Sequence, residues 1–230
     1  MAIASEEGLL AERRSTEPNA HSSQLTPFIT QLLEECDLHP ADIGAVCVSA
    51  GPGSYTGLRI GVSTAKGFCY ALGIPLLSVP TLQGMATHYL AQHPDYRGLV
   101  CPMIDARRME CYTAFYTLAD ADSTADLATF ASRLREVRAT GADIVAEGIY
   151  DEFLDRGPVT FIGDGAPKCF PLLGSHPNAR LDETFAISAE GLLPEALRRL
   201  REGRGEDVAY FEPFYLKDFV AKKSVVRGLR

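Results

Sequence analysis

The sequence predicts an α/β protein, and three neighbouring features carry that prediction. A valine-rich apolar run at residues 43–49 leads into a glycine-rich turn, an amphipathic segment at 57–72 and a second apolar run at 74–79. Short apolar runs that alternate with helical periodicity are typical of a mostly parallel sheet covered by helices. With 46% hydrophobic and 23% charged residues over 230 positions, the chain has enough apolar material for a sizeable core.

The residues before position 43 have the pattern of a hairpin followed by a helix. Residues 1–5 and 9–14 flank Glu6-Glu7-Gly8, and Gly8 suits the positive φ of a tight turn. Apolar side chains then recur with helical spacing, which predicts an amphipathic helix that packs on a core. They are Leu25, Phe28, Ile29, Leu32, Leu33 and Cys36.

The residues after position 79 have the pattern of one more helix followed by a second lobe. Gly73 ends the helix at 57–72, and Thr81 is a suitable N-cap for a helix that reaches Ala91. The loop at 93–98 predicts a boundary between a first lobe, residues 1–97, and a second, residues 98–204, with 205–230 completing the first. Further predicted elements are strands at 99–105, 110–118 and 159–162 and a helix at 188–201 kinked by Pro194.

Charge and composition limit the function classes. A net charge of -8 and a pI near 5.2 disfavour direct nucleic-acid binding, because Lys and Arg contacts to phosphates supply most of that affinity. The last ten residues are basic, through Lys222, Lys223, Arg227 and Arg230, and we expect a solvated terminus rather than a phosphate contact. The six scattered cysteines predict buried free thiols.

The start of the chain and its apolar runs bear on location. Glu6 and Glu7 interrupt any apolar core that a signal peptide would need. No apolar stretch approaches the roughly 20 residues that cross a bilayer. We therefore expect a cytoplasmic protein without a membrane partner.

The glycine-rich turn is the strongest candidate for chemistry. Gly51 and Gly53 permit backbone angles that side chains forbid, and the hydroxyls and amides that follow lie at a helix N-terminus, where anions bind well. The pattern matches neither common phosphate fingerprint, so a tight turn without a ligand is an equally good interpretation. The candidate anion site comprises Gly51, Pro52, Gly53, Ser54, Tyr55, Thr56 and Arg59.

Other candidate sites have a weaker basis. Gly57, Gly61 and Ala65 form a ridge of small residues that suits either the chain's own sheet or a helix of another chain. Asp105 and the arginines that follow could meet an anion, although a solvated hairpin turn is favoured. The histidines lack the spacing of a helical zinc site, and no nucleophile with a partner base is recognisable.

Several motifs in order resemble those of one family. The string at 49–61, SAGPGSYTGLRIG, resembles the signature of the TsaB family, whose members are subunits of the bacterial machinery that makes threonylcarbamoyladenosine at position 37 of tRNAs. Matching motifs follow at 65–67 (AKG), 79–82 (VPTL), 104–112 (IDARRMECY), 163–165 (GDG) and 213–217 (PFYLK). The second-lobe motif residues are Asp105, Ala106, Arg107, Gly163, Asp164 and Gly165.

The resemblance implies a two-lobed fold of the acetate and sugar kinase, Hsp70 and actin type. It also implies a supporting subunit that pairs with TsaD, the paralogue that performs the transfer, and works with the ATPase TsaE. The pairing surface would use the helices at 22–36 and 57–72, and the same surface would form a homodimer when TsaD is absent. Its candidate residues are Leu25, Phe28, Ile29, Leu32, Gly57, Gly61, Thr64, Ala65 and Phe68.

The resemblance further implies that chemistry is absent from this chain. Where the paralogue carries a metal-binding histidine pair, this chain has His21 followed by Ser22, Ser23 and Gln24. We therefore expect no metal and no intrinsic cofactor, with ATP or ADP only in the assembled complex and tRNA contacted only indirectly. The alternative functions are a stand-alone ATP-dependent phosphotransferase or ATPase of the same fold and, more remotely, a peptidase.

The family's first strand has no counterpart in this sequence. Residues 1–4 match the second strand of TsaB-like chains, so the first strand is expected to be missing. In this fold the first strand lies inside the sheet of the lobe. Its loss would leave two strand edges unpaired.

Overall fold

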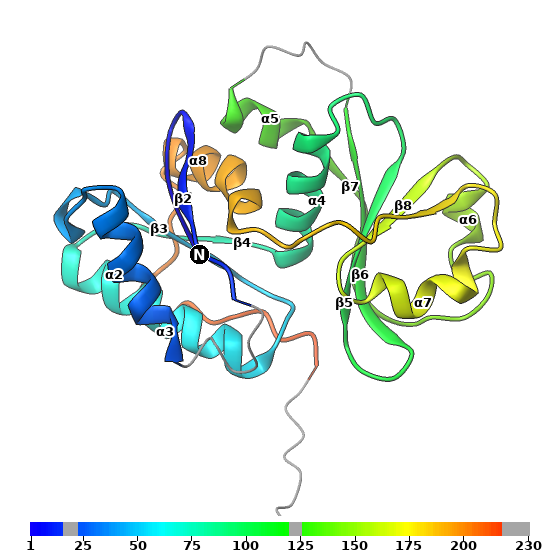
Figure 1. Ribbon diagram of the computed structural model, residues 1–230, viewed down its shortest axis with the longest axis horizontal. Helices are drawn as coiled ribbons and strands as arrows, with labels where there is room; N and C mark the ends of the chain where they lie inside the picture. The colour runs from blue at the N-terminus through cyan, green and yellow to red at the C-terminus, as the bar shows by residue number, and fades with distance from the viewer. Residues whose placement is uncertain (16–22, 120–125, 218–230) are drawn as a thin grey trace, which may run out of the picture.

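A computed structural model describes residues 1–15, 23–119 and 126–217 (Figure 1). His21, the predicted helix start at Ser22 and the basic terminal segment lie outside these residues. The strands are β1 (Ala2–Ser5), β2 (Gly8–Glu12), β3 (Val46–Ser49), β4 (Leu76–Val79), β5 (Leu99–Asp105), β6 (Glu110–Leu118), β7 (Leu134–Ile144), β8 (Val159–Ile162) and β9 (Ala179–Leu181). The helices are α2 (Leu25–Glu35), α3 (Tyr55–Leu72), α4 (Thr81–Gln92), α5 (Leu127–Arg133), α6 (Asp151–Leu154), α7 (Ala166–Leu173) and α8 (Leu193–Arg201), with 3-10 turns η1 (Pro40–Asp42) and η2 (Ala189–Leu192).

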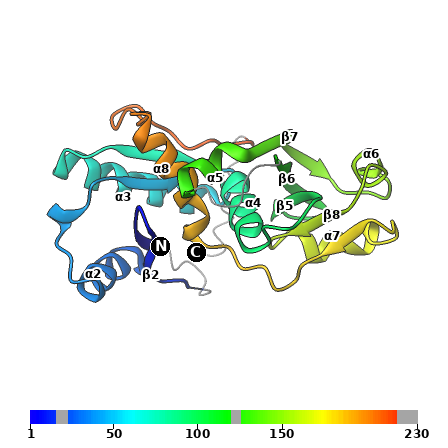
Figure 2. The same cartoon turned by 90° about the horizontal axis from the view of Figure 1, so that it is seen from above.

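The first lobe contains two separate two-stranded sheets. β1 and β2 form the predicted antiparallel hairpin, and β3 and β4 form the predicted parallel pair. Among residues 1–15, 23–119 and 126–217, no ladder joins the hairpin to the pair, which agrees with the expectation of unpaired edges in this lobe. Helix α2 contacts the hairpin, whereas α3 packs on β3. Figure 2 shows the hairpin and α2 on one side of the lobe and β3 with α3 on the other.

Local signals in the sequence set the ends of α3. The hydroxyl oxygen of Ser54 accepts the backbone N–H of Gly57 at 3.4 Å, so the helix begins at Tyr55, two residues before the predicted start. Gly73 ends it in the left-handed conformation with φ 67°.

The predicted N-cap role of Thr81 in α4 is wrong, because Pro80 occupies the cap and Thr81 is already helical. The Thr81 hydroxyl instead bonds that of Ser49 at 2.5 Å.

The second lobe is built on a five-stranded sheet with the order β7-β6-β5-β8-β9. Strands β5, β6 and β8 have the predicted bounds. Sequence analysis did not find β7, because this outer strand carries charged residues along both faces and leaves most of its length exposed. The core between this sheet and helices α6 and α7 is dominated by buried aromatic and sulfur-containing side chains, among them Phe115, Tyr150, Phe161, Cys111 and Cys169.

Two helices, α4 and α8, lie between the lobes, and α4 packs on the second sheet although it belongs to the predicted first lobe. The apolar side of α4, including Leu82, Met85 and Leu90, packs against Val100 and Ile162 of the second sheet. Helix α8, drawn in orange left of the middle in Figure 1, packs against α5 and β4. The predicted helix at 188–201 is two pieces, η2 and α8, which meet just before Pro194.

The segment after α8 runs back along the first lobe. The backbone N–H of Glu206 donates to the carbonyl of Leu76 at 2.7 Å, and Lys66 donates to the carbonyls of Ala209 and Phe211. Glu206, Ala209 and Phe211 of this segment thus contact the first lobe, and its assignment to that lobe stays a prediction. Within the described residues, no helix combines the length and apolar character that crossing a bilayer requires.

Candidate partner-binding face and motif clusters

The glycine loop is held by the chain's own C-terminal segment. The backbone N–H of Phe214 donates to the carbonyl of Ala50 at 2.7 Å. Gly51 has φ 106°, and a side-chain carbon there would lie 2.5 Å from the Phe214 carbonyl oxygen. Only glycine fits such a close approach at such a backbone angle. The motifs at 49–61 and 213–217 are therefore in direct contact with each other.

The polar groups that follow this loop also have partners within the chain. Ser54 caps α3, and the ring of Tyr55 lies 4.8 Å from that of Tyr215. Arg59 donates to the Tyr55 hydroxyl at 2.7 Å, and this hydrogen bond raises the pKa of the guanidinium. The loop therefore acts structurally as a rigid entry to α3. Anion binding at Gly51–Thr56 stays a prediction.

The small-residue ridge of α3 faces the chain's own sheet. Nearest to a side-chain carbon built on Gly61 is Val48 of β3, at 3.9 Å, and Ala65 is buried in the cluster that contains Cys69 and Leu76. At Gly57 such a carbon would meet only the Ser54 side chain. Ala65 is therefore a core residue of this chain, whereas Thr64 and Phe68 are partly exposed.

The opposite side of α3 is open. Arg59, Ser63 and Gly67 are exposed, and a side-chain carbon at Gly67 would meet nothing within 4 Å. Tyr70 is 86% exposed, more than any other large hydrophobic side chain in the described residues. We call Arg59, Ser63, Gly67 and Tyr70 the outer face of α3. The residues of α3 that the sequence predicted for the interface differ from this face, and two of them, Gly61 and Ala65, point toward the chain's own sheet.

The apolar residues of α2 divide between core and surface. Leu32 is fully buried, whereas Leu25, Phe28 and Ile29 are partly exposed. Leu25 and Phe28 line a cavity of about 380 Å³ that also borders the end of the hairpin at Glu12–Arg14. Three of the four predicted interface residues on α2 are thus reachable from outside.

The second-lobe motifs meet at the ends of β5 and β8. The Asp164 carboxylate accepts the backbone N–H of Asp105 at 3.1 Å, and the Asp105 carboxylate accepts the N–H of Arg107 at 2.6 Å. Lys168 forms an ion pair with Asp105 and donates to the carbonyls of Arg108 and Glu110. The hydrogen bond from Lys168 lowers the pKa of Asp105.

The turn after Asp105 has an unusual backbone. Arg107 and Arg108 both have positive φ, 74° and 53°, in a hairpin position where asparagine and glycine are preferred. The backbone N–H of Ala106 donates to the carbonyl oxygen of Glu110 at 3.0 Å and closes the hairpin. Both arginines are exposed. The turn therefore places two cations at the end of the hairpin.

Two motif glycines allow the close packing of this region. A side-chain carbon at Gly163 would lie 2.5 Å from the Met103 carbonyl oxygen, and one at Gly165 would lie 2.8 Å from the Cys111 sulfur. Lys217 of the last motif forms an ion pair with Glu110. The structure thus brings the motifs at 104–112, 163–165 and 213–217 together.

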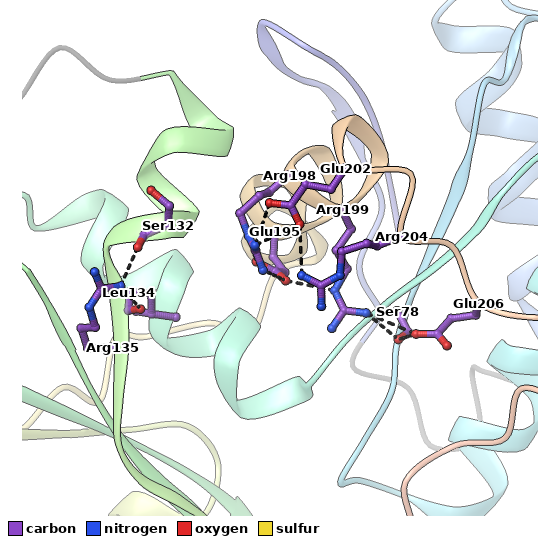
Figure 3. Close-up of polar contacts among 10 residues, drawn as sticks. All are labelled: Ser78, Ser132, Leu134, Arg135, Glu195, Arg198, Arg199, Glu202, Arg204 and Glu206. Atoms are coloured by element: carbon purple, nitrogen blue, oxygen red, sulfur yellow. Dashed lines mark hydrogen bonds and ion pairs between the residues drawn. The ribbon is translucent and has the colours of Figure 1, made fainter.

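A charged network on α8 was not found by sequence analysis (Figure 3). Glu195 is 2% exposed and accepts hydrogen bonds from Arg198 at 2.7 Å and Arg199 at 3.0 Å. Arg199 also reaches Glu206 at 3.2 Å, and Glu206 accepts from the Ser78 hydroxyl at 2.5 Å. The network ties α8 to β4 and the returning segment. The spacing Glu-x-x-Arg-Arg was its only sequence signal.

Within the described residues, no group of three or more His, Cys, Asp and Glu side chains is placed to hold a metal ion. His88 is buried on α4, with its Nδ1 3.8 Å from the Glu190 carboxylate. Burial lowers the pKa of this imidazole, and the nearby Glu190 opposes the shift. Neither group lies in one of the motif clusters.

Known proteins resemble this chain over most of its length. The family model described as "TsaD: tRNA N6-adenosine threonylcarbamoyltransferase" matches residues 15–224. The tRNA threonylcarbamoyladenosine biosynthesis protein TsaB of Bacillus subtilis is 32% identical over 216 residues, which cover 86% of this chain and 88% of that protein. This chain belongs to the TsaB family. The Escherichia coli TsaB protein is 28% identical, with 90% of this chain and 85% of that protein covered.

Solved structures confirm the fold of this TsaB-family chain. YeaZ from Pseudomonas aeruginosa superimposes with a TM-score of 0.67 at 25% identity, covering 90% of this chain and 92% of that one. A second structure from that organism, described as similar to peptidase YEAZ, gives 0.71 at 24% identity, with 91% and 92% covered. The predicted two-lobed, actin-like α/β fold is confirmed.

Proposed function

We propose that this chain is a partner subunit that binds a TsaD-like paralogue and supports formation of N6-threonylcarbamoyladenosine at adenosine 37 of tRNA. Its relatives from Bacillus subtilis and Escherichia coli are named as biosynthesis proteins for that nucleoside. The supporting observation in the structure is the contrast between the motif residues and α3. The glycine loop and the second-lobe motifs contact other parts of this chain, whereas the outer face of α3, which includes the motif residues Arg59 and Gly67, has no cover from the described chain.

The outer face of α3 suits a helix of another protein. Gly67 and Ser63 allow a second backbone to approach closely. Tyr70 offers a large amphipathic ring, the kind of side chain that contributes most to binding energy in protein interfaces. Phe28 and Ile29 of α2 are also partly exposed and stay predicted interface residues, although α2 lies on the other side of the lobe from α3 (Figure 2). Leu32 and Ala65 would support the contact from the core and would not touch the partner.

Co-purification tests the pairing. A tagged TsaD-like protein from the same organism should retain this chain in a stoichiometric complex, and the Gly67→Glu/Tyr70→Asp variant should lose retention. Val137→Asp, which places a charge at a 43% exposed apolar residue of β7, is the matched control and should pair normally. Unchanged pairing of the α3 variant would refute this face as the interface. Substitution at Ala65 would be uninformative, because it would disturb the core.

Reconstitution tests the supporting role. The paralogue with a TsaE-like ATPase should modify tRNA only when this chain is added, and this chain without the paralogue should modify none. The net charge of -8 favours tRNA contact through the partners rather than through this chain. In the absence of the paralogue we expect the outer face of α3 to pair two copies, which light scattering would detect as a dimer that Tyr70→Asp dissociates.

Nucleotide titration separates this proposal from a stand-alone phosphotransferase or ATPase. Calorimetry with millimolar ATP, with and without Mg²⁺, should show no binding to the isolated chain. Binding together with ATP turnover would support the enzyme instead. We propose that any ATP or ADP acts in the assembled complex, in the cytoplasm.

A further inference from the structure

Three of the six cysteines lie together in the core of the second lobe. Cys101 of β5, Cys111 of β6 and Cys169 of α7 are fully buried and belong to one cluster. The sulfur atoms of Cys111 and Cys169 lie 3.4 Å apart, although 58 positions separate the two residues in the sequence. A disulfide bond is about 2.05 Å long, so the two sulfur atoms need to approach by about 1.4 Å to bond. These two cysteines are therefore a pair in contact rather than isolated thiols.

The surroundings of the pair favour sulfur chemistry over metal binding. Two thiols do not complete a tetrahedral metal site, and among the described residues no third His, Cys, Asp or Glu is placed to join them. Burial raises the pKa of Cys111 to about 12, and its contact with Cys169 adds to the shift. Because the thiolate is the reactive form of cysteine, the closed fold keeps the pair as thiols. The pair becomes reactive only when the cover over it opens.

Helix α7 carries Cys169 and is the element whose movement would uncover the pair. It is only 8 residues long and lies against β5, β8 and β9 (Figure 1). Pro171 lies inside the helix and has no N–H, so it cannot donate to the carbonyl of Pro167 four residues earlier. Lys168 holds the first turn of the helix through its ion pair with Asp105. A short helix with an interrupted hydrogen-bond ladder opens at a lower free energy than the whole fold.

We propose that Cys111 and Cys169 form a reversible disulfide when α7 opens in the presence of a small-molecule disulfide. The thiolate of one cysteine attacks a sulfur of the small disulfide, which gives a mixed disulfide and releases one small thiolate. The thiolate of the second cysteine then attacks the protein sulfur of the mixed disulfide, and the other small thiolate leaves. The two protons lost by the cysteines end on the two released thiols. The protein is oxidised by loss of two hydrogen atoms, and the small disulfide is reduced.

The bond would connect two motif regions of the second lobe. Cys111 belongs to the motif at 104–112, and Cys169 follows the motif at 163–165 on α7. The disulfide would hold α7 against β6 and would keep Lys168 beside Asp105. Because a cross-link between distant residues restricts the unfolded chain, the oxidised protein should resist urea better than the reduced protein. A thiol reductant would reverse the bond.

Peptide mapping tests the bond on the whole chain. The protein is incubated under native conditions with oxidised glutathione, its remaining thiols are alkylated, and the digest is analysed by mass spectrometry. We expect a peptide pair joined through Cys111 and Cys169, which dithiothreitol separates. The partly exposed Cys36 reports that the oxidant has reacted, because it should carry glutathione. Free thiols at Cys111 and Cys169 in protein that carries glutathione at Cys36, or a bond from Cys111 to Cys101, would overturn the proposal.

Urea unfolding tests the effect of the bond on stability. The oxidised protein should have a higher urea midpoint than the same protein in dithiothreitol. Cys169→Ala should abolish both the joined peptides and this difference. The matched control is Cys69→Ala, which removes a buried thiol of the first lobe and should retain both. If Cys169→Ala does not fold, the comparison within the unaltered protein decides, and equal midpoints with and without dithiothreitol would contradict the cross-link.

The rate of bond formation tests the opening of α7. Pro171→Ala supplies the missing N–H and should slow formation of the disulfide at least about threefold, because it stabilises the closed helix. Pro167→Ala is the matched control, since a proline in the first turn of a helix costs no hydrogen bond, and its rate should be unchanged. Equal rates for the two variants would refute the opening of α7 as the route. None of these measurements involves the outer face of α3, so their outcome is independent of pairing with a TsaD-like protein.

Discussion

The carbonyl oxygen of Phe214 occupies the space that a side chain at Gly51 would need. A carbon built on Gly51 falls 2.5 Å from that oxygen, and Leu58 lies a further 0.7 Å out, at 3.2 Å. The backbone of Phe214 also donates to Ala50 at 2.7 Å. The first and last motifs of the chain therefore stabilise each other although more than half of the sequence separates them.

Replacement of Gly51 should weaken this contact. For Gly51→Ala we expect a loss of roughly 2 to 4 kcal/mol in the free energy of unfolding, because alanine disfavours φ 106° and would displace the 213–217 segment. Gly53→Ala is the matched control, since its nearest neighbour would be Leu58 at 3.8 Å. Chemical denaturation measures both. Equal stabilities for the two variants would contradict the close-approach explanation.

Lys168 should contribute more to the free energy of unfolding than its partly exposed ion pair alone would. Its ammonium serves the Asp105 carboxylate and also the carbonyls of Arg108 and Glu110. Lys168→Met should cost about 1 kcal/mol of unfolding free energy, with the ion-pair part discounted for solvent screening. Lys217→Met removes a surface pair with Glu110 and a contact with the Tyr112 ring at 6.0 Å, and should cost less than about 0.5 kcal/mol. The reverse order in urea unfolding would show that the turn does not depend on Lys168.

Loss of the buried Glu195 carboxylate should destabilise the fold more than loss of the exposed Glu202 carboxylate. Glu195→Gln leaves Arg198 and Arg199 without the charge that both contact. We expect a loss of about 2 kcal/mol, below the usual cost of breaking a fully buried pair because both arginines are partly exposed. The control is Glu202→Gln, whose side chain is 41% exposed and pairs with Arg198. A smaller loss for Glu195 than for Glu202, measured by denaturation, would argue against the network in Figure 3.

Acid should destabilise the fold through His88. Because burial lowers its pKa in the folded state from 6.5, the unfolded chain binds more protons as the pH falls below that value. The free energy of unfolding should therefore decrease as the pH falls below about 6.5. His88→Gln should flatten this part of the profile when urea unfolding is followed between about pH 5 and 7.5. Parallel profiles for the two proteins would rule out His88 as the source.

Sequence patterns predicted the elements whose signals are local. The hairpin at Gly8, the strands β5, β6 and β8, and the stop of α3 at Gly73 each follow from a short run of residues. The strand β7 was missed because an outer strand with charges on both faces has no alternation to detect. Thr81 was misplaced by one position because its hydroxyl serves Ser49 on a neighbouring strand instead of its own helix.

The candidate site was predicted less well than the fold. The sequence located α3 and its small residues, but a helix with glycines on several sides does not reveal which side meets its own sheet. The structure decided this through β3, since Val48 lies under Gly61 while Gly67 and Tyr70 remain open. The α8 network also needed the structure, because Ser78 and Glu206 reach Arg199 only after the segment returns.

By itself the sequence determined the family, the two-lobed α/β class and most element positions, because caps, turns and periodicity act over a few residues. Tertiary structure alone decided which motifs touch, which face of α3 is free, and that the first lobe divides into two sheets. These features depend on strand pairing and close approach between residues far apart in the chain, such as Gly51 with Phe214. No local pattern encodes such contacts, because their free energy arises only when distant segments are packed together.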